Sequence, residues 1–181
     1  MSPKPTLTVS GDTNINNGTK PVTKNVSRNS IRNATNDAVE VYSLEAFRQA
    51  GITSVVSLLE AQEVSKAGLS SEPTVAKKLG ITFTAFPIKD YGLPVSDASY
   101  LTFVRELWQR IHRGEQVLVH CYGGIGRSGM VVAGILIYDG FTPEEAFAYV
   151  SNKRKHSVPD TAEQKQWVTN LHQSLVDLRL N

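Results

Sequence analysis

The sequence predicts a single α/β domain with a central, mostly parallel sheet of four or five strands and helices on both sides. Two observations predict this fold. Short apolar segments alternate with helical segments from about residue 38 onward, and a glycine-rich stretch joins an apolar strand to an apolar helix. The length of 181 residues suits one domain with a substantial core. In such sheets ligands bind at the carboxyl ends of the strands, so we expect the site there.

The composition is typical of a soluble globular protein. Hydrophobic residues make up 40% and charged residues 20% of the chain, and no apolar run approaches the roughly 18 residues of a membrane span. The N-terminus lacks the apolar core of a signal peptide, and a single cysteine excludes an internal disulfide and multi-cysteine zinc sites. We therefore expect a cytoplasmic protein, although a specialised secretion route would leave no readable mark. We also expect no cofactor.

Residues 1–36 are predicted to form an irregular, asparagine-rich N-terminal arm that precedes a catalytic domain over 37–181. The arm holds seven asparagines and has a net charge of +4, whereas the remainder has −2. Its basic residues are scattered without aromatic neighbours, so we expect no nucleic-acid binding. Within the arm, residues 7–9 alternate in polarity and could pair as an edge strand.

Two repeats of helix, glycine and strand open the domain. The first has a helix over 43–50, capped by Ser43, and a strand over 52–59. The second has a helix over 73–79 and a strand over 81–88. The first strand is rich in apolar residues, which indicates burial in a sheet covered on both faces.

The second half of the chain adds further helices, each with its own start or stop signal. They are a helix from Ser96 or Asp97 to Gly114, an apolar helix over 130–138, a helix from the capping box Thr142–Glu145 to about Lys155, and a helix from about Thr161 through Leu178.

Residues 117–129, VLVHCYGGIGRSG, carry the chemistry. The glycines allow successive backbone N–H groups to point inward, and the helix that follows adds the positive end of its dipole. Arg127 offers a planar guanidinium that can bind two oxygens of a tetrahedral anion. The same positive field favours the thiolate form of Cys121, which the Ser128 hydroxyl could reach. We predict a phosphate-binding loop made of Tyr122, Gly123, Gly124, Ile125, Gly126 and Arg127.

The string His-Cys, five residues, Arg-Ser resembles the signature of the protein tyrosine phosphatase superfamily, dual-specificity type. The loop looks most like that of the kinase-associated phosphatase, a member that acts on cyclin-dependent kinases. The resemblance covers about residues 38–172. It implies a cysteine-dependent, metal-free hydrolase that removes phosphate from phosphotyrosine, and from phosphoserine or phosphothreonine, through a cysteinyl-phosphate intermediate. No clear equivalent of the tyrosine-recognition loop of tyrosine-specific members is present.

Asp90 is the predicted general acid, because departure of an alkoxide or phenoxide is slow without protonation. It lies in the segment PIKDYGLP over 87–94, directly after a predicted strand, in a loop that could close over the site. The resemblance supports this role, since related phosphatases carry Pro-Ile-x-Asp-x-Gly-x-Pro about thirty residues before the cysteine. A turn-stabilising role is the other interpretation of Asp90. Asp97 is the fallback acid, although helix capping is favoured for it.

Three further residues are candidates by resemblance. His120 would hydrogen-bond the loop backbone and help to hold the thiolate. Residues 160–167, DTAEQKQW, resemble the Gln-Thr-x-x-Gln segment that orients the hydrolytic water in tyrosine-specific members, with Gln164 at the second glutamine. Asp160 stands where the first glutamine would be, so a water-positioning role stays open and helix capping is favoured for Asp160. Asp90, acting as base, could suffice.

Tyr91 and Arg154 are candidate residues of the substrate rim, although the basic cluster around Arg154 is more typical of a solvated helix end. The side chains of Tyr122 and Ile125 are expected at the rim. Phosphoinositide phosphatases often carry lysines at these two positions, which weakens that substrate class. Three alternatives stay open: a phosphatase for inositol phosphates, phosphoinositides or another non-protein phosphoester, a rhodanese-type sulfurtransferase, and a phosphate-binding pseudophosphatase that holds a phosphorylated protein.

Overall fold

The structure is a computed structural model that describes residues 8–9 and 44–180. Most of the predicted arm over 1–36, the predicted domain start at residue 37 and the predicted cap Ser43 lie outside these residues. Thr8–Val9 form a short strand, β1, so the predicted edge pairing is present over two residues.

The sheet of the described residues has four strands in the order β1-β4-β2-β3, and every pairing is parallel. Three of these strands have four residues each, and β1 has only two. The prediction of a mostly parallel sheet flanked by helices is confirmed, with a strand count at its lower end. The full strands are β2 (Ser54–Ser57), β3 (Thr82–Ala85) and β4 (Val117–His120).

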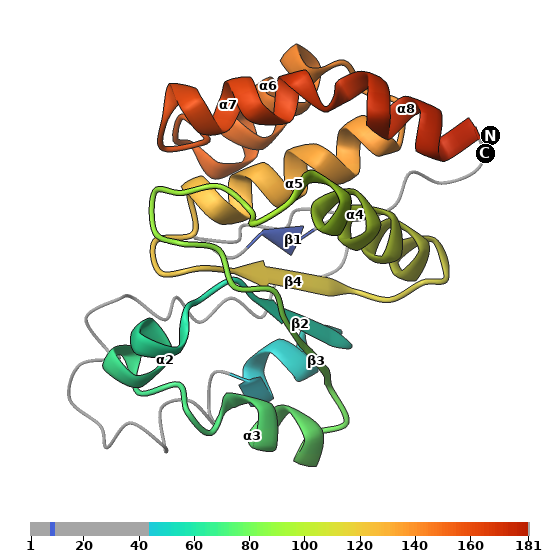
Figure 1. Cartoon of the computed structure of the whole chain (residues 1–181). Helices are drawn as coiled ribbons and strands as arrows, with labels where there is room; N and C mark the ends of the chain where they lie inside the picture. The colour runs from blue at the N-terminus through green and yellow to red at the C-terminus, as the bar shows by residue number, and fades with distance from the viewer. Residues whose placement is uncertain (1–7, 10–43, 181) are drawn as a thin grey trace.

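The helices pack on both faces of this sheet, with α2 and α3 on one face and the remaining labelled helices on the other (Figure 1). Residues 44–49 are also helical. The labelled helices are α2 (Ala61–Ala67), α3 (Glu72–Lys78), α4 (Asp97–His112), α5 (Gly126–Tyr138), α6 (Pro143–Arg154), α7 (Ala162–Asn170) and α8 (His172–Leu180).

Side chains alternate across the strands and so divide the core in two. Val56 and Val119 face the large cluster beneath α4 and α5, whereas Val55 and Leu118 face a smaller cluster toward α3. Helix α5 is buried almost throughout, because α4, α6, α7 and α8 pack around it. Its N-terminus is thereby fixed directly after β4, an inner strand of the sheet.

Two helix predictions need correction. Helix α2 was not predicted, because none of its residues is buried and its sequence therefore lacks an apolar stripe. The predicted last helix is two helices, α7 and α8, which are separated by Leu171. Leu171 N donates to Val168 O over 3.2 Å, which tightens the last turn of α7. No glycine or proline marks this position, so the sequence pattern gave no sign of the break.

The predicted cap of α6 is confirmed, whereas the capping prediction for Asp97 is wrong. Ser96, the other predicted start, caps α4, since its Oγ accepts from Ser99 N over 3.1 Å. Thr142 and Glu145 form a capping box at the start of α6, with bonds of 3.3 Å and 2.9 Å.

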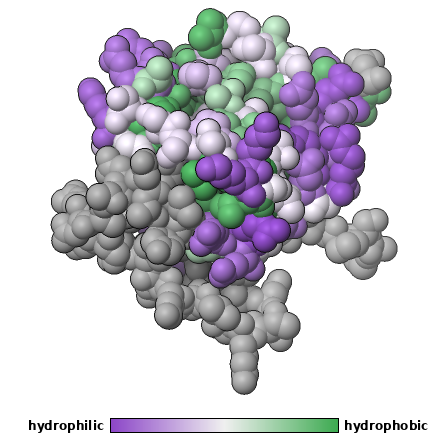
Figure 2. Space-filling view, turned by 90° about the horizontal axis from the view of Figure 1, so that it is seen from below, coloured by the Kyte–Doolittle hydropathy of each residue, from purple (hydrophilic) through white to green (hydrophobic). Residues whose placement is uncertain are grey.

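The surface on the α2 and α3 side is mixed, and hydrophilic residues flank a small hydrophobic area there (Figure 2). Among the described helices, none has the length and apolar character needed to cross a membrane.

Candidate active site

The carboxyl ends of three neighbouring strands meet at one edge of the sheet. Strand β4 leads into the Cys121 loop, β3 leads to Asp90, and β2 leads into α2 with Glu63. Backbone bonds continue beyond the strands, since Ile88 N donates to Leu58 O over 3.1 Å. Parallel pairing therefore brings these three loops together, as expected for a site in an α/β sheet.

The loop after β4 wraps around the Cys121 sulfur. Gly124 N lies 3.2 Å from Cys121 Sγ and donates to it, and Ser128 Oγ lies 3.6 Å from the same sulfur. Gly124 has a φ of +69°, a conformation that side-chain-bearing residues rarely adopt. A backbone N–H and a hydroxyl group are therefore close enough to stabilise negative charge on the sulfur.

Arg127 lies at the start of α5 and is only 2% exposed. Its guanidinium donates to both carboxylate oxygens of Glu63, over 2.6 Å and 2.8 Å, and to Ile88 O over 3.0 Å. Burial alone would lower the pKa of Arg127, but the Glu63 bond and the charges of Cys121, Glu63 and Asp90 raise it. The bond from Arg127 likewise lowers the pKa of Glu63. The cation is thus held in one orientation at the base of the loop.

Sequence reasoning missed Glu63, although it makes the shortest bond to Arg127. Its carboxylate also accepts from Glu60 N over 3.0 Å at the start of α2. A glutamate three residues after another at a helix start is the only local signal, and it indicates helix capping rather than a site.

Asp90 lies at the mouth of the site. Its Oδ1 is 3.0 Å from Arg127 Nη2, and its side chain is 56% exposed. The same oxygen accepts from Tyr91 N over 3.2 Å. Tyr91 has a φ of +54° and an exposed ring, so the predicted acid sits on a constrained turn open to solvent.

Asp160 and Gln164 lie beside Gly126, the residue before Arg127 in the loop. A Cβ added to Gly126 would overlap Asp160 Oδ2 and would lie 2.9 Å from Gln164 Oε1, so a side chain there would require these two side chains to move. Gln164 is fully buried and its Nε2 donates to Gly92 O, in the Asp90 loop, over 3.1 Å. The capping prediction for Asp160 is wrong, because Thr161 Oγ1 accepts from Gln164 N over 3.1 Å and caps α7.

His120 lies beneath the loop. Its Nε2 is 3.0 Å from Glu72 Oε1, a residue of α3 that is 6% exposed and that sequence reasoning also missed. The ring is misaligned for a hydrogen bond, so this contact is an ion-pair approach only. The side-chain bond from His120 to the loop backbone that the resemblance implies is not among the contacts of the described residues.

The rim residues divide into two groups. Tyr122 and Tyr91 are each 64% exposed, as expected of residues at a rim. Ile125, the N-cap residue of α5, is partly buried against the main core, so its rim position stays a prediction. Arg154 is the last residue of α6 and is partly buried.

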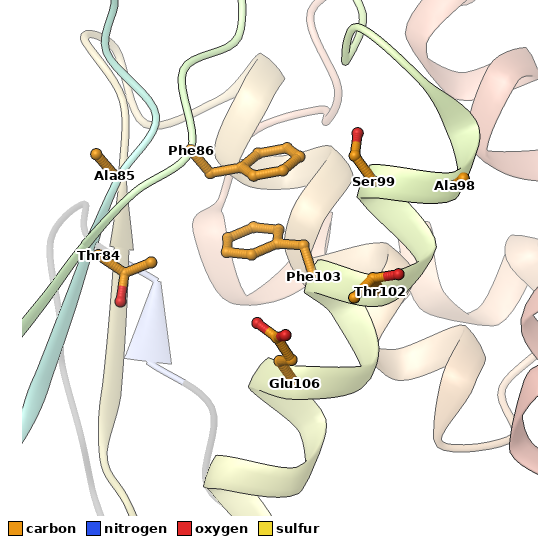
Figure 3. A pocket seen from close by; sticks show the side chains of 8 residues that line it. All are labelled: Thr84, Ala85, Phe86, Ala98, Ser99, Thr102, Phe103 and Glu106. Atoms are coloured by element: carbon orange, nitrogen blue, oxygen red, sulfur yellow. The ribbon is translucent and has the colours of Figure 1, made fainter.

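A separate surface hollow lies between β3 and α4 (Figure 3). The Phe86 and Phe103 rings stack in it with centroids 4.1 Å apart, and Thr102 and Glu106 line it from α4. None of the predicted catalytic residues borders this hollow. Within the described part of the chain, no group of three or more His, Cys, Asp or Glu side chains is placed to hold a metal ion.

Comparison with curated proteins finds phosphatase domains. The chain is 31% identical over 145 residues to bovine protein tyrosine phosphatase domain-containing protein 1, which covers 75% of this chain and 18% of that protein. It is 29% identical over 126 residues to human cyclin-dependent kinase inhibitor 3, covering 68% of this chain and 59% of the relative. The chain thus spans about a fifth of the first relative's length and somewhat over half of the second's.

Solved structures share the fold. Kinase associated phosphatase with its catalytic cysteine replaced by serine matches with a TM-score of 0.69 at 27% identity, covering 75% of this chain and 76% of that one. Tk-PTP in its active form matches with a TM-score of 0.65 at 30% identity, covering 74% and 86%.

The family model described as "Swiss Army Knife protein, DSP-PTPase phosphatase domain" matches residues 30–176, which is most of the sequence. The matched range includes the Asp90 loop, the Cys121 loop and the Gln164 helix. The chain therefore belongs to this family of dual-specificity and protein tyrosine phosphatase domains.

Proposed function

We propose that the chain hydrolyses phosphotyrosine, and phosphoserine or phosphothreonine, in proteins through a cysteinyl-phosphate formed on Cys121. One observation carries this proposal. A sulfur held by an N–H and a hydroxyl lies in the same loop as the buried Arg127, whose Nη2 is 3.0 Å from Asp90 Oδ1. Nucleophile, anion-binding cation and acid are therefore in one place.

In the first step the Cys121 sulfur attacks phosphorus, and the leaving oxygen takes a proton from Asp90. Arg127 and the loop amides hold the equatorial oxygens. In this structure Asp90 Oδ1 lies on Arg127 Nη2, where a phosphoryl oxygen would bind. Substrate therefore displaces the Asp90 carboxylate from the guanidinium and moves it toward the leaving group.

In the second step water attacks phosphorus and Cys121 departs as a thiolate, stabilised by the Ser128 hydroxyl 3.6 Å away. His120 supports the strand end from which the loop starts. The family resemblance gives the proton of this water to Asp90, and the approach of Gln164 Oε1 to Gly126 supports a role for Gln164 in orienting the water.

A protein substrate is supported by the relatives and by the rim. The relatives include proteins named for tyrosine phosphatase domains and for cyclin-dependent kinases. The exposed Tyr91 and Tyr122 rings can flank the side chain of a phosphotyrosine, and Arg154 is a candidate for contacts farther out. Another fold neighbour, PTPMT1, has been solved with PI(5)P, at 23% identity. Tyr122 and Ile125 do not offer the extra cations that a phosphoinositide headgroup favours.

The test is hydrolysis of a generic aryl phosphate by wild type, Cys121→Ser, Asp90→Ala and Asp97→Ala. Cys121→Ser should abolish turnover, and Asp90→Ala should lower kcat by about 100- to 10,000-fold. Asp97→Ala is the matched control, because Asp97 is exposed at the start of α4 and should leave the rate unchanged. Turnover by Cys121→Ser would refute the mechanism, and a large loss in Asp97→Ala would move the acid role there.

Substrate class needs a second measurement. Phosphotyrosine, phosphoserine and phosphothreonine peptides are compared by kcat/KM with soluble inositol phosphates and with PI(5)P in vesicles. We expect the phosphotyrosine peptides to be fastest. Faster turnover of the inositol compounds would replace the protein substrate with a non-protein phosphoester.

A further inference from the structure

The geometry points to Asp160 as the base of the second half-reaction: its carboxylate takes the proton of the hydrolytic water while Gln164 Oε1 accepts the water's other hydrogen. This inference rests on the proposed function and deepens it. It gives Asp160 a role that the corresponding glutamine of tyrosine-specific members could not fill, because an amide does not accept a proton near neutral pH.

Two oxygen acceptors converge beside Gly126. Asp160 Oδ2 and Gln164 Oε1 both approach the position that a Cβ of Gly126 would take. Gly126 directly precedes Arg127 in the loop that holds Cys121 Sγ, so these oxygens lie at the wall of the predicted phosphate site.

Gln164 Oε1 is an acceptor without a donor. It is buried in a fully buried side chain and accepts no hydrogen bond from the residues that the structure describes. Its amide nitrogen is engaged, since Nε2 donates to Gly92 O over 3.1 Å, and this bond fixes which way the oxygen points. A buried acceptor of this kind requires a donor, and two neighbouring acceptors suit one water that donates both of its hydrogens.

A water held in this way presents a lone pair rather than a hydrogen to phosphorus. The lone pair forms the new O–P bond, and the S–P bond breaks with its electron pair moving to Cys121 Sγ. The water's proton goes to Asp160 Oδ2. The products are the Cys121 thiolate, a phosphate dianion and a neutral Asp160, so atoms and charges balance. The exposed Asp160 side chain then returns its proton to solvent.

Asp160 and Asp90 occupy different positions at the loop, and Asp160 does not cap the helix that follows it. Thr161 caps α7 in place of Asp160, and Asp90 Oδ1 lies on Arg127 Nη2 at the mouth of the site. The two carboxylates therefore approach different residues of the loop, Asp90 at Arg127 and Asp160 at Gly126. Asp90 suits the protonation of a leaving group, and Asp160 suits the deprotonation of a water.

The experiment follows p-nitrophenyl phosphate by rapid quench with Asp160→Asn, which keeps the shape of the side chain but removes the base. Nitrophenolate release reports the first step, and trapped cysteinyl-phosphate reports the second. We expect a burst equal to the enzyme concentration with an unchanged first-step rate constant. Steady-state turnover should then be lower by about 100-fold, with the phosphoenzyme accumulating.

Three variants make this test specific. Asp160→Gln also keeps an oxygen acceptor without a base, on a longer side chain, and should accumulate phosphoenzyme as Asp160→Asn does. Asp160→Glu keeps a base and should recover most of the steady-state rate. Asp177→Asn removes an exposed carboxylate on α8 and should behave as wild type.

Wild-type turnover in both Asp160→Asn and Asp160→Gln, with no phosphoenzyme trapped, would overturn the inference. A burst slowed as much as the steady state would also overturn it, because Asp160 would then act before hydrolysis. Absence of any nitrophenolate release by wild type is a different failure: it would overturn the hydrolase function itself and the role of Asp160 with it.

Discussion

The two flanks of the phosphate-binding loop are built in opposite ways. On the Arg127 flank the guanidinium is bonded to Glu63 and Ile88 and lies against Asp90. On the Gly126 flank, Gln164 Oε1 and Asp160 Oδ2 approach the backbone, and the glutamine oxygen accepts no hydrogen bond from the described residues.

This difference fits two kinds of chemistry. Binding a phosphoryl group needs a cation that does not reorganise when the substrate arrives, and a buried ion pair provides that rigidity. Hydrolysis of an intermediate needs a small molecule that enters and is consumed at each turnover, which acceptor oxygens can hold and release. The polar groups of the Arg127 flank are therefore paired without a ligand. On the Gly126 flank, the proposed water would supply the hydrogen-bond donor that Gln164 Oε1 lacks among the described residues.

Of the changes to Arg127, Gly126 and Glu63, Arg127→Lys should have the largest effect on activity. It disrupts the Arg127 flank, which we call the rigid flank because Glu63 and Ile88 hold the guanidinium. A lysine cannot bond both oxygens of Glu63 and two oxygens of the phosphoryl group, so we expect kcat/KM for an aryl phosphate to fall by about 1,000-fold. The matched control is Arg105→Lys, an exposed position of α4, which should leave kcat/KM unchanged. Equal activity of Arg127→Lys and wild type would show that the guanidinium geometry is not needed.

Gly126→Ala should disturb the other flank. The added methyl group would overlap Asp160 Oδ2 and lie 2.9 Å from Gln164 Oε1, so these side chains must move away from the loop, and we expect kcat to fall by about 100-fold. Gly123→Ala is the comparison, because a Cβ there meets nothing within 4 Å, and its loss should be much smaller. Similar losses in the two variants, measured by steady-state kinetics, would mean that crowding at Gly126 is unimportant.

The rigid flank was only half predictable from the sequence. Cys121, Arg127 and Ser128 lie within eight consecutive positions, so spacing alone indicates their proximity. Glu63 is 64 residues from Arg127 and sits on a short helix with no buried residue, where a glutamate looks like any solvated one. Partners of this kind depend on which loops the sheet order brings together, and that order is not local information.

The same distinction explains the fold. Strands and helices with an apolar pattern or a clear cap were predicted, as at Ser96 and Thr142. Helix α2 was missed because it has no buried residue and therefore no apolar pattern, and the break at Leu171 was missed because no glycine or proline marks it. The choice of Thr161 over Asp160 as cap also depends on geometry, since both side chains are good caps.

Glu63→Ala should lower stability as well as activity. The variant tests whether the rigid flank is held together by the Glu63–Arg127 ion pair. Removing the carboxylate leaves the 2%-exposed Arg127 without its main partner. Breaking a buried pair from one side costs about 3 kcal/mol, and the melting temperature should fall accordingly. Glu163→Ala, at an exposed position of α7, is the control and should melt near wild type. An unchanged melting temperature in Glu63→Ala would mean that solvent replaces the pair at no cost.

The smallest expected effect is the pH dependence of this ion pair. The bond from Arg127 lowers the pKa of Glu63 from its ordinary value of 4.5, so the folded state binds this proton less readily than the unfolded chain. The stability that Glu63 contributes is therefore fully present above about pH 4.5 and is lost as the pH falls through the lower, folded-state pKa. Urea unfolding of wild type and Glu63→Gln should give a difference in unfolding free energy that is constant from pH 7 to about pH 5 and shrinks below it. A difference that stays constant into strong acid would show that the charge of Glu63 is not what holds Arg127.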